Sequence, residues 1–222
     1  MAQYIIEPNL LGVKINNPSP NYSLEIEFER RGGRPTFLDI RFFYDMGGPT
    51  RMLVYERDAQ DYFNNFDKLK LNPKLQYVDA GAGLAGLVPF LVAKFGQKLV
   101  SRPIIIDPVD YNLMSSMLRS AQELNLGTDI DKRLKELTQR TEIILDSEKV
   151  YLVNMTLGNA IREIPELKGT ADVVIDFLGP SNYPSTEISG SEPSADIEGI
   201  VLEMERMLLK PDGLHLFKSA TR

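Results

Sequence analysis

The sequence predicts an α/β protein in which a mainly parallel sheet follows an antiparallel β extension at the N-terminus. Two observations carry this prediction. Up to about residue 57, apolar and polar residues alternate with a period of two, which is typical of half-buried strands. From residue 58 onward, strand-like and helix-like apolar patterns take turns, which indicates βα units and a parallel sheet. We therefore divide the chain into an extension, residues 1–57, and a main domain, residues 58–222.

The N-terminal extension contains three predicted strands. Residues 22–29, with the sequence YSLEIEFE, and residues 38–44, with the sequence LDIRFFY, each alternate apolar with polar side chains. Glycine-containing turns separate these runs from each other and from a third run at residues 52–55. Because turns of this kind favour hairpins, we expect a three-stranded antiparallel meander with a solvated charged face.

The main domain is predicted to contain five strands with helices between them. Within residues 58–71 a helix is predicted, because Tyr62, Phe63, Phe66 and Leu69 are spaced to form one apolar stripe. Asn72–Pro73 ends it. Two further helical patterns, residues 111–125 and 129–144, lie between the second and third strands, and a last helix precedes the turn sequence KPDG at residues 210–213. The strands are expected at residues 75–79, 104–107, 150–155, 173–177 and 214–217.

Composition excludes several kinds of site. The chain has 222 residues, a formal net charge of −6, one histidine and no cysteine, so disulfides, thiolate metal sites and cysteine nucleophiles are ruled out. The single histidine, His215, weakens any mechanism that needs a Ser-His-Asp triad, and we expect it to be a structural strand residue. No apolar run approaches the roughly 20 residues that span a bilayer, and no signal-peptide pattern begins the sequence. We expect a cytoplasmic protein with no metal site and no membrane association.

A glycine-rich turn between a predicted strand and a predicted helix is the most informative motif. The sequence LQYVDAGAGLAG, residues 75–86, places Gly81, Gly83 and Gly86 at the spacing G-x-G-x-x-G. In such a turn the first glycine allows a tight bend, the second lets a ligand approach the backbone, and the third permits close packing of helix on strand. The motif predicts a nucleotide-binding loop, although small residues in such a turn also serve packing alone.

Acidic residues flank this turn. Asp107 ends the second predicted strand, where its carboxylate is placed to accept hydrogen bonds from ribose hydroxyls. Its alternative role is to cap the following helix, since Asp107–Pro108 has the pattern of a helix start, unless Asp110 is the cap. Asp79 precedes the first glycine by two positions. A carboxylate there would repel a diphosphate but suits a ligand that carries an ammonium and a sulfonium charge.

These features resemble the class I S-adenosylmethionine-dependent methyltransferases, whose first motif is an acidic residue followed by the same glycine spacing. The resemblance runs from residue 75 to the C-terminus. It includes ADVVID at residues 171–176, similar to the family's fourth-strand motif, and LLKPDGL at residues 208–214, similar to the Leu-Lys-Pro-Gly-Gly motif before the fifth strand. The resemblance implies a Rossmann-like, doubly wound sheet of about five strands in the order 3-2-1-4-5, and S-adenosyl-L-methionine as the cofactor.

The resemblance also implies which residues meet the cofactor and the acceptor. Asp107 matches the family's ribose-binding position, and Asn159 takes the place of the aspartate that contacts adenine, whose hydrogen bond an amide oxygen can still accept. Asp176 and Tyr183 follow the fourth strand and are the candidate catalytic residues, with a role in loop structure or packing as the alternative for each. The predicted cofactor-binding residues are Asp79, Ala80, Gly81, Ala82, Gly83, Gly86, Asp107, Pro108, Asn159, Ala160 and Asp176.

The chain departs from the family pattern in two places. It stops soon after the fifth predicted strand, where the family usually continues into a helix and two more strands, so we expect either a minimal five-stranded sheet or an incomplete C-terminus. It also has two helical patterns between the second and third strands, where the family usually has one.

The sequence leaves the methyl acceptor open among small molecules, proteins and RNA. No Asn-Pro-Pro-Tyr motif, which the family uses on amino groups of bases or glutamine, is present. Two other functions stay open: a catalytically inactive, methyltransferase-like binding or scaffold subunit, and an NAD-dependent oxidoreductase. The oxidoreductase leaves Asp79 and the KPDG turn unexplained. We expect the N-terminal extension and the loop at residues 179–194 to cover the acceptor site, or the extension to mediate dimerisation.

Overall fold

The chain folds into two compact units. The first unit contains residues 1–56 and 109–142, and the second contains residues 57–108 and 143–222. The computed structural model describes residues 9–16, 23–29, 36–40, 51–54, 56–182 and 197–218. Residues 109–142 thus interrupt the second unit along the sequence and belong to the first.

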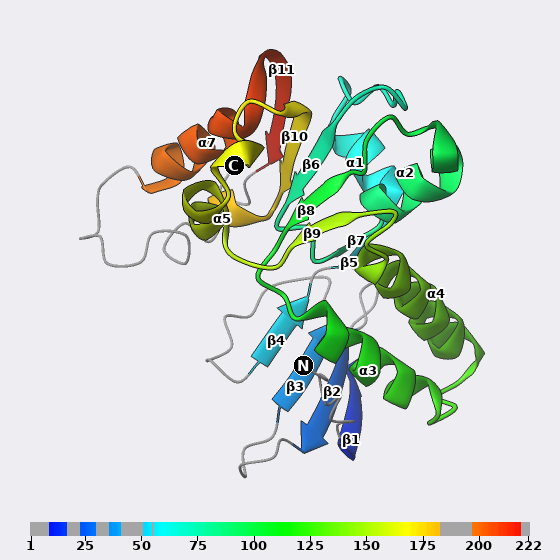
Figure 1. Ribbon diagram of the computed structural model, residues 1–222. Coiled ribbons are helices and arrows are strands. Elements are labelled where there is room, and N and C mark those ends of the chain that lie inside the picture. Colours follow the sequence, from blue (N-terminus) through cyan, green and yellow to red (C-terminus); the bar gives the residue numbers. More distant parts are fainter. Residues whose placement is uncertain are drawn as a thin grey trace. The chain divides into compact units, whose positions relative to one another are not determined.

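The second unit is built on a parallel sheet of five strands (Figure 1). In chain order these are β6 (Tyr77–Ala80), β8 (Ile104–Ile106), β9 (Tyr151–Val153), β10 (Ala171–Phe177) and β11 (Leu209–Lys218). In space their order is β11-β10-β6-β8-β9, and every neighbouring pair is parallel. Read from β9, this is the order 3-2-1-4-5. The predicted Rossmann-like α/β fold is therefore confirmed.

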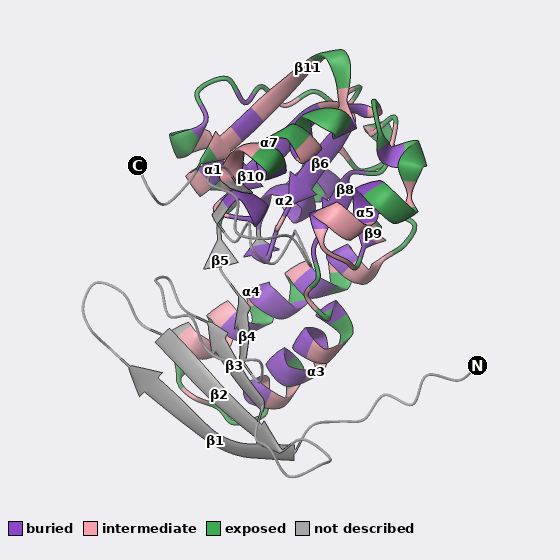
Figure 2. Ribbon diagram, turned by 90° about the vertical axis from the view of Figure 1, so that its left-hand side faces the viewer, coloured by how far each residue is buried: buried purple, intermediate pink, exposed green. Residues whose placement is uncertain are grey.

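Helices cover both faces of this sheet. Helices α1 (Ala59–Asn65) and α2 (Leu87–Phe95) lie on one face, and α5 (Leu157–Glu163) and α7 (Ile197–Leu208) lie on the other. Shorter elements are the 3₁₀ helices η1 (Gly96–Lys98), η2 (Pro165–Leu167) and η3 (Pro180–Asn182) and the paired two-residue strands β5 (Glu56–Arg57) and β7 (Leu84–Ala85). Figure 2 shows that the most buried residues follow the central strands and the inner sides of the helices.

The alternation of side chains along each strand decides what each face of the sheet receives. Val78 and its neighbours Ile104 and Ile106 join the core that packs against α5 and α7. The intervening positions, Asp79 on β6 and Ile105 on β8, therefore point to the face that α1 and α2 cover. This places a carboxylate in an otherwise apolar row.

The first unit combines a four-stranded sheet with a helical hairpin. The strands β1 (Asn9–Asn16), β2 (Ser23–Glu29), β3 (Thr36–Ile40) and β4 (Arg51–Val54) lie in that order. The first two pairs are antiparallel, but β3 and β4 are parallel. The predicted three-stranded antiparallel meander is wrong in two respects. The sheet has a further strand, β1, and β4 runs parallel to β3 instead of antiparallel. The connection from residue 41 to residue 50 is longer than the 2–5 residues of a hairpin loop, so it does not force a reversal.

The helical hairpin of the first unit consists of α3 (Tyr111–Gln122) and α4 (Thr128–Leu145). The two predicted helices between the second and third strands of the parallel sheet are thus confirmed. Asp110 is the N-cap of α3, and its side chain accepts the N–H of Leu113 at 3.0 Å. Asp110 therefore takes the capping role that was the alternative for Asp107.

Two elements of the second unit differ from the prediction. Helix α1 ends at Asn65 instead of residue 71, and the Asn65 side chain donates to the carbonyl of Asp61 at 2.7 Å, which competes with helical bonding. Residues 210–213, predicted as a turn, lie inside β11 as a bulge. There β11 advances from Leu209 to Leu214 while β10 advances only from Ala171 to Val173.

Candidate functional site

The carboxyl ends of β6 and β10 mark the point at which the strand order of the parallel sheet reverses. Open α/β sheets bind ligands in the crevice beyond the carboxyl ends of the strands at such a point. The glycine-rich turn follows β6, and Gly179 with Pro180 follows β10. The structure therefore brings the predicted nucleotide-binding loop to the edge of the sheet where a ligand is expected.

The conformation of the glycine-rich turn depends on its first two glycines. Gly81 has a φ of +65° and Gly83 a φ of +53°, in the left-handed region that favours glycine. The N–H of Gly81 donates to the carbonyl of Ile106 at 2.8 Å, and the N–H of Gly83 donates to Oδ2 of Asp107 at 2.7 Å. These bonds tie the turn to the end of β8. Gly86, the buried N-cap of α2, has a φ of −85° and does not use this freedom.

The first glycine also packs directly against the loop after β10. A Cβ atom added to Gly81 would lie 2.6 Å from Cα of Gly179 and 2.7 Å from Cδ of Pro180. A Cβ added to Gly179 would lie 2.4 Å from the carbonyl oxygen of Ala80. Real Cβ atoms do not approach other atoms this closely, so neither position accepts a side chain without movement. The two loops that border the site are in backbone contact.

Asp79 is buried in the floor of the site, with 1% of its surface exposed. In the sheet it lies between Ile105 and Ile175, its register partners on the neighbouring strands. The hydroxyl of Tyr62 on α1 donates to Oδ2 of Asp79 at 3.2 Å. A buried carboxylate is costly without such partners, so the hydrogen bond is part of what allows an acid at this position.

Asp107, which follows β8, joins the glycine turn to the end of β9. Besides accepting the Gly83 N–H, it donates its own N–H to the carbonyl of Val153 at 3.1 Å. Its carbonyl accepts a hydrogen bond from Nδ2 of Asn154 at 3.0 Å. The carboxylate of Asp107 is buried beside the turn. By the alternation of β8, Asp107 leaves the sheet on the same face as Ile105 and Asp79.

Asp176 holds the loop after β10. It is fully buried, its Oδ1 accepts the N–H of Gly179 at 2.6 Å, and its Oδ2 accepts the N–H of Ser181 at 2.7 Å. Both carboxylate oxygens thus serve the loop that contacts Gly81. The other candidate catalytic residue, Tyr183, lies outside the described residues.

The remaining predicted residues lie at different places, two of them in or next to the turn and the others outside it. Asn159 lies in the first turn of α5, where its N–H donates to Oγ1 of Thr156 and its Oδ1 accepts from Arg162. None of these bonds reaches the glycine turn. Ala160 is buried in the core between α5 and the sheet. Ala80 and Ala82 are buried at the end of β6 and in the turn, and Pro108 is exposed beyond Asp107.

Three residues of this edge were not predicted from the sequence: Tyr62, Asn154 and Ser181. Tyr62 was assigned to the apolar stripe of a helix, although a buried tyrosine hydroxyl needs a polar partner and thus signals one nearby. Asn154 follows β9 directly, and a polar residue after a parallel strand is a candidate for the ligand edge. Ser181 carried no comparable signal.

His215 has a structural role, as expected. It lies in β11 beside Val174 of β10, and its Nε2 is 2.6 Å from Oε2 of the buried Glu205 on α7. Burial, helped by the charge of Arg206 and opposed by Asp176, lowers the pKa of His215. The contact with Glu205 joins β11 to α7.

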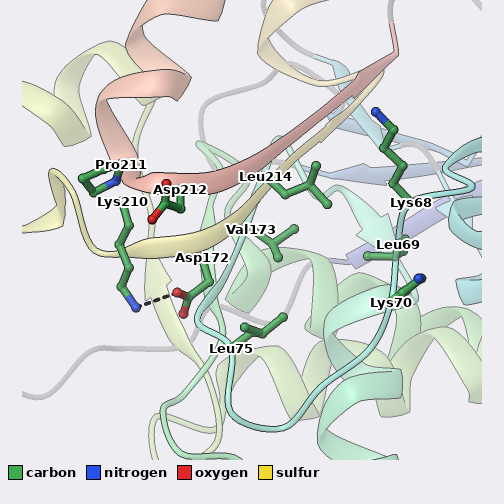
Figure 3. Close-up of a pocket in the computed structure, with 10 residues that line it drawn as sticks. All are labelled: Lys68, Leu69, Lys70, Leu75, Asp172, Val173, Lys210, Pro211, Asp212 and Leu214. Carbon is green, nitrogen blue, oxygen red and sulfur yellow. Dashed lines mark hydrogen bonds and ion pairs between the residues drawn. The ribbon is translucent and has the colours of Figure 1, made fainter.

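A hollow of about 510 Å³ lies at the opposite edge of the sheet, beside the amino-terminal parts of β10 and β11 (Figure 3). Its lining includes Leu75, Val173 and Leu214, and Nζ of Lys210 turns to Oδ1 of Asp172 at 2.7 Å. Burial alone would raise the pKa of Asp172, but the N–H of Gln76 and the Lys210 ammonium outweigh it and lower that pKa. The hollow is separate from the candidate site.

Comparison with known proteins does not identify a family. No protein-family model matches the sequence, and no curated protein is significantly similar to it. Within the described ranges, no helix combines the length and apolarity needed to cross a membrane. The described residues also contain no cluster of three or more acidic or histidine side chains that could hold a metal ion.

Proposed function

We propose that this protein is an S-adenosylmethionine-dependent methyltransferase. The observation that carries the proposal is the pair of buried carboxylates, Asp79 and Asp107, at the ends of adjacent strands on either side of a glycine turn with left-handed backbone. The strand order of the sheet and the family-like motifs at residues 79–86 and 208–214 support it further. Two acids at the ligand edge favour a ligand that carries positive charge.

The residues present fit this cofactor. Asp79 would pair with the ammonium group of the methionine part, and the turn from Gly81 to Gly83 would let the ligand approach the backbone. Asp107 would accept the ribose hydroxyls, because carboxylate oxygens are hydrogen-bond acceptors and this side chain lies beside the glycine turn, where it accepts the N–H of Gly83. S-adenosylmethionine, when bound, supplies an electrophilic methyl group on a sulfonium.

Catalysis by this site would rest on alignment more than on a proton-transferring side chain. Methyl transfer is an in-line displacement, so an enzyme gains mainly by holding donor and acceptor in the reactive geometry. We assign Asp176 to holding the loop after β10, because its oxygens accept the Gly179 and Ser181 N–H groups. That loop would then support the acceptor side of the site.

Calorimetry with S-adenosylmethionine and S-adenosylhomocysteine tests the proposal. We expect both to bind, and Asp79→Asn and Asp107→Asn each to weaken binding about 10- to 150-fold, since a hydrogen bond to a charged group is worth roughly 1.5–3 kcal/mol. Asp172→Asn is the matched control, an acid on the same sheet at the opposite edge, and should bind like the wild type. Absence of heat with either ligand, in a folded sample, would overturn the proposal.

A second candidate is a subunit that binds the cofactor without turnover. It is favoured by the engagement of both oxygens of Asp176, the candidate catalytic carboxylate, with N–H groups of the loop after β10, which gives this side chain a structural role. Binding of S-adenosylmethionine with no methyl transfer to small-molecule, protein or RNA acceptors would favour this candidate. An NAD-dependent oxidoreductase is disfavoured by Asp79, whose carboxylate would repel a diphosphate.

A further inference from the structure

Tyr62 connects the α1 helix to the carboxylate that the proposed function assigns to the methionine part of the cofactor. Its hydroxyl donates to Oδ2 of Asp79 at 3.2 Å, and both side chains have 1% of their surface exposed. The two residues are 17 positions apart in the sequence. Their contact therefore exists only because α1 packs on the face of the sheet to which Asp79 points.

The ring of Tyr62 is held by aromatic packing. The ring centroid of Phe177, at the end of β10, lies 5.1 Å from that of Tyr62. The two ring planes meet at 80°, which is an edge-to-face arrangement. The ring centroid of Phe66, the residue that directly follows α1, lies 6.4 Å from that of Tyr62 and 5.4 Å from that of Phe177. Phe63 on the neighbouring side of α1 packs against Phe90 of α2 at 5.8 Å. These contacts restrict where the Tyr62 hydroxyl can lie.

The hydrogen bond affects the carboxylate in two ways. Asp79 lies in an apolar row between Ile105 and Ile175, where burial disfavours the charged form, and a hydroxyl donor to the charged form opposes that effect. A donor on Oδ2 also restricts rotation of the carboxylate. Both effects prepare Asp79 to receive a cation rather than to remain an inert core group.

We infer that Tyr62 is a positioning residue that sets the affinity of the site for the amino-acid part of S-adenosylmethionine. The inference rests on the proposed function. Tyr62 acts through Asp79, so its hydroxyl should matter for ligands that carry the ammonium group. It should not matter for ligands that carry only the adenosine part.

Two ligands separate this role from general support of the fold. S-adenosylhomocysteine contains the amino-acid part, and 5′-methylthioadenosine lacks it. We expect Tyr62→Phe, which keeps the ring, to weaken the binding of S-adenosylhomocysteine about three- to tenfold. This is less than for loss of a short hydrogen bond to a charged group, because the bond is 3.2 Å long and Tyr62 acts only through Asp79. The affinity of this variant for 5′-methylthioadenosine, measured by the same calorimetry, should be unchanged.

Tyr77→Phe is the matched control. Tyr77 is also a buried tyrosine, two residues before Asp79 on β6, but its hydroxyl bonds to the backbone of Asn72 at 2.8 Å and 3.1 Å. Its loss should leave both affinities unchanged. A double-mutant cycle gives a second measurement: in the Asp79→Asn background, Tyr62→Phe should no longer change the affinity for S-adenosylhomocysteine.

The outcomes are distinguishable. Equal weakening of both ligands by Tyr62→Phe, or no weakening of either, would overturn the positioning role while the proposed function stands. An equal effect of Tyr77→Phe and Tyr62→Phe on S-adenosylhomocysteine would overturn it as well. If the folded wild type binds neither ligand, both the proposed function and this inference fail. Urea unfolding of each variant verifies that the compared proteins are folded.

Discussion

The contact between the two loops at the edge of the parallel sheet can be tested with a single methyl group. Gly81→Ala places a Cβ atom 2.6 Å from Cα of Gly179 and 2.7 Å from Cδ of Pro180, at a φ of +65°. The left-handed conformation costs a non-glycine residue about 1–2 kcal/mol. Overpacking adds about 1–3 kcal/mol, because backbone and a proline ring must move. We expect Gly81→Ala to lower the free energy of unfolding by about 2–5 kcal/mol.

Gly169→Ala separates these two costs. Gly169 has a φ of +67°, and a Cβ there would lie no closer than 4.0 Å to the carbonyl oxygen of Leu209. This variant therefore carries the conformational cost without the clash, and both glycines belong to the second unit. The change in unfolded-chain entropy from glycine to alanine is common to both and cancels.

The assay is urea unfolding monitored by far-ultraviolet circular dichroism. The free energies of unfolding of the two variants are compared for the same unfolding transition. Gly81→Ala should be less stable than Gly169→Ala by about 1–3 kcal/mol, the overpacking part alone. Equal stability of the two variants, within about 0.5 kcal/mol, would refute the reasoning. The loop after β10 would then not be packed against Gly81 in solution.

Two further predictions concern carboxylates of β10. Asp176→Asn replaces one carboxylate oxygen with an NH₂ group, which then faces a backbone N–H without an acceptor. The variant should lower the free energy of unfolding of the second unit by about 1–3 kcal/mol, measured by urea unfolding. A variant as stable as the wild type would contradict the assigned role. The pKa of Asp172 is lowered in the folded state, so its contribution to stability is present above the unfolded pKa of about 3.9 and is lost as the pH falls through the lower folded value. The difference in urea midpoint between wild type and Asp172→Asn should therefore persist from pH 7 to about pH 4 and shrink below it, and a difference that does not change with pH would count against this.

Local patterns were enough to predict the parallel sheet and most of its elements. The apolar runs that became β8 and β10 are short, bounded and separated by amphipathic helices, and these are properties of neighbouring residues along the chain. The same holds for Asp110, whose capping bond reaches only three residues ahead. The N-terminal sheet was harder, because alternation predicts a strand but says nothing of its direction. The structure pairs β3 with β4 in parallel, which alternation alone does not distinguish from antiparallel pairing.

The sequence by itself determined that an acid lies at the end of the first strand of the parallel sheet with three glycines after it, and that a second acid follows the next strand. Backbone sterics favour glycine where φ is positive, and strand periodicity decides which face an acid points to. Only the tertiary structure decided which partners these groups have. The bond from Tyr62 to Asp79 and the packing of Gly179 on Gly81 join residues far apart in the chain. They arise from the docking of a helix and the adjacency of β6 and β10, and no local pattern encodes such contacts.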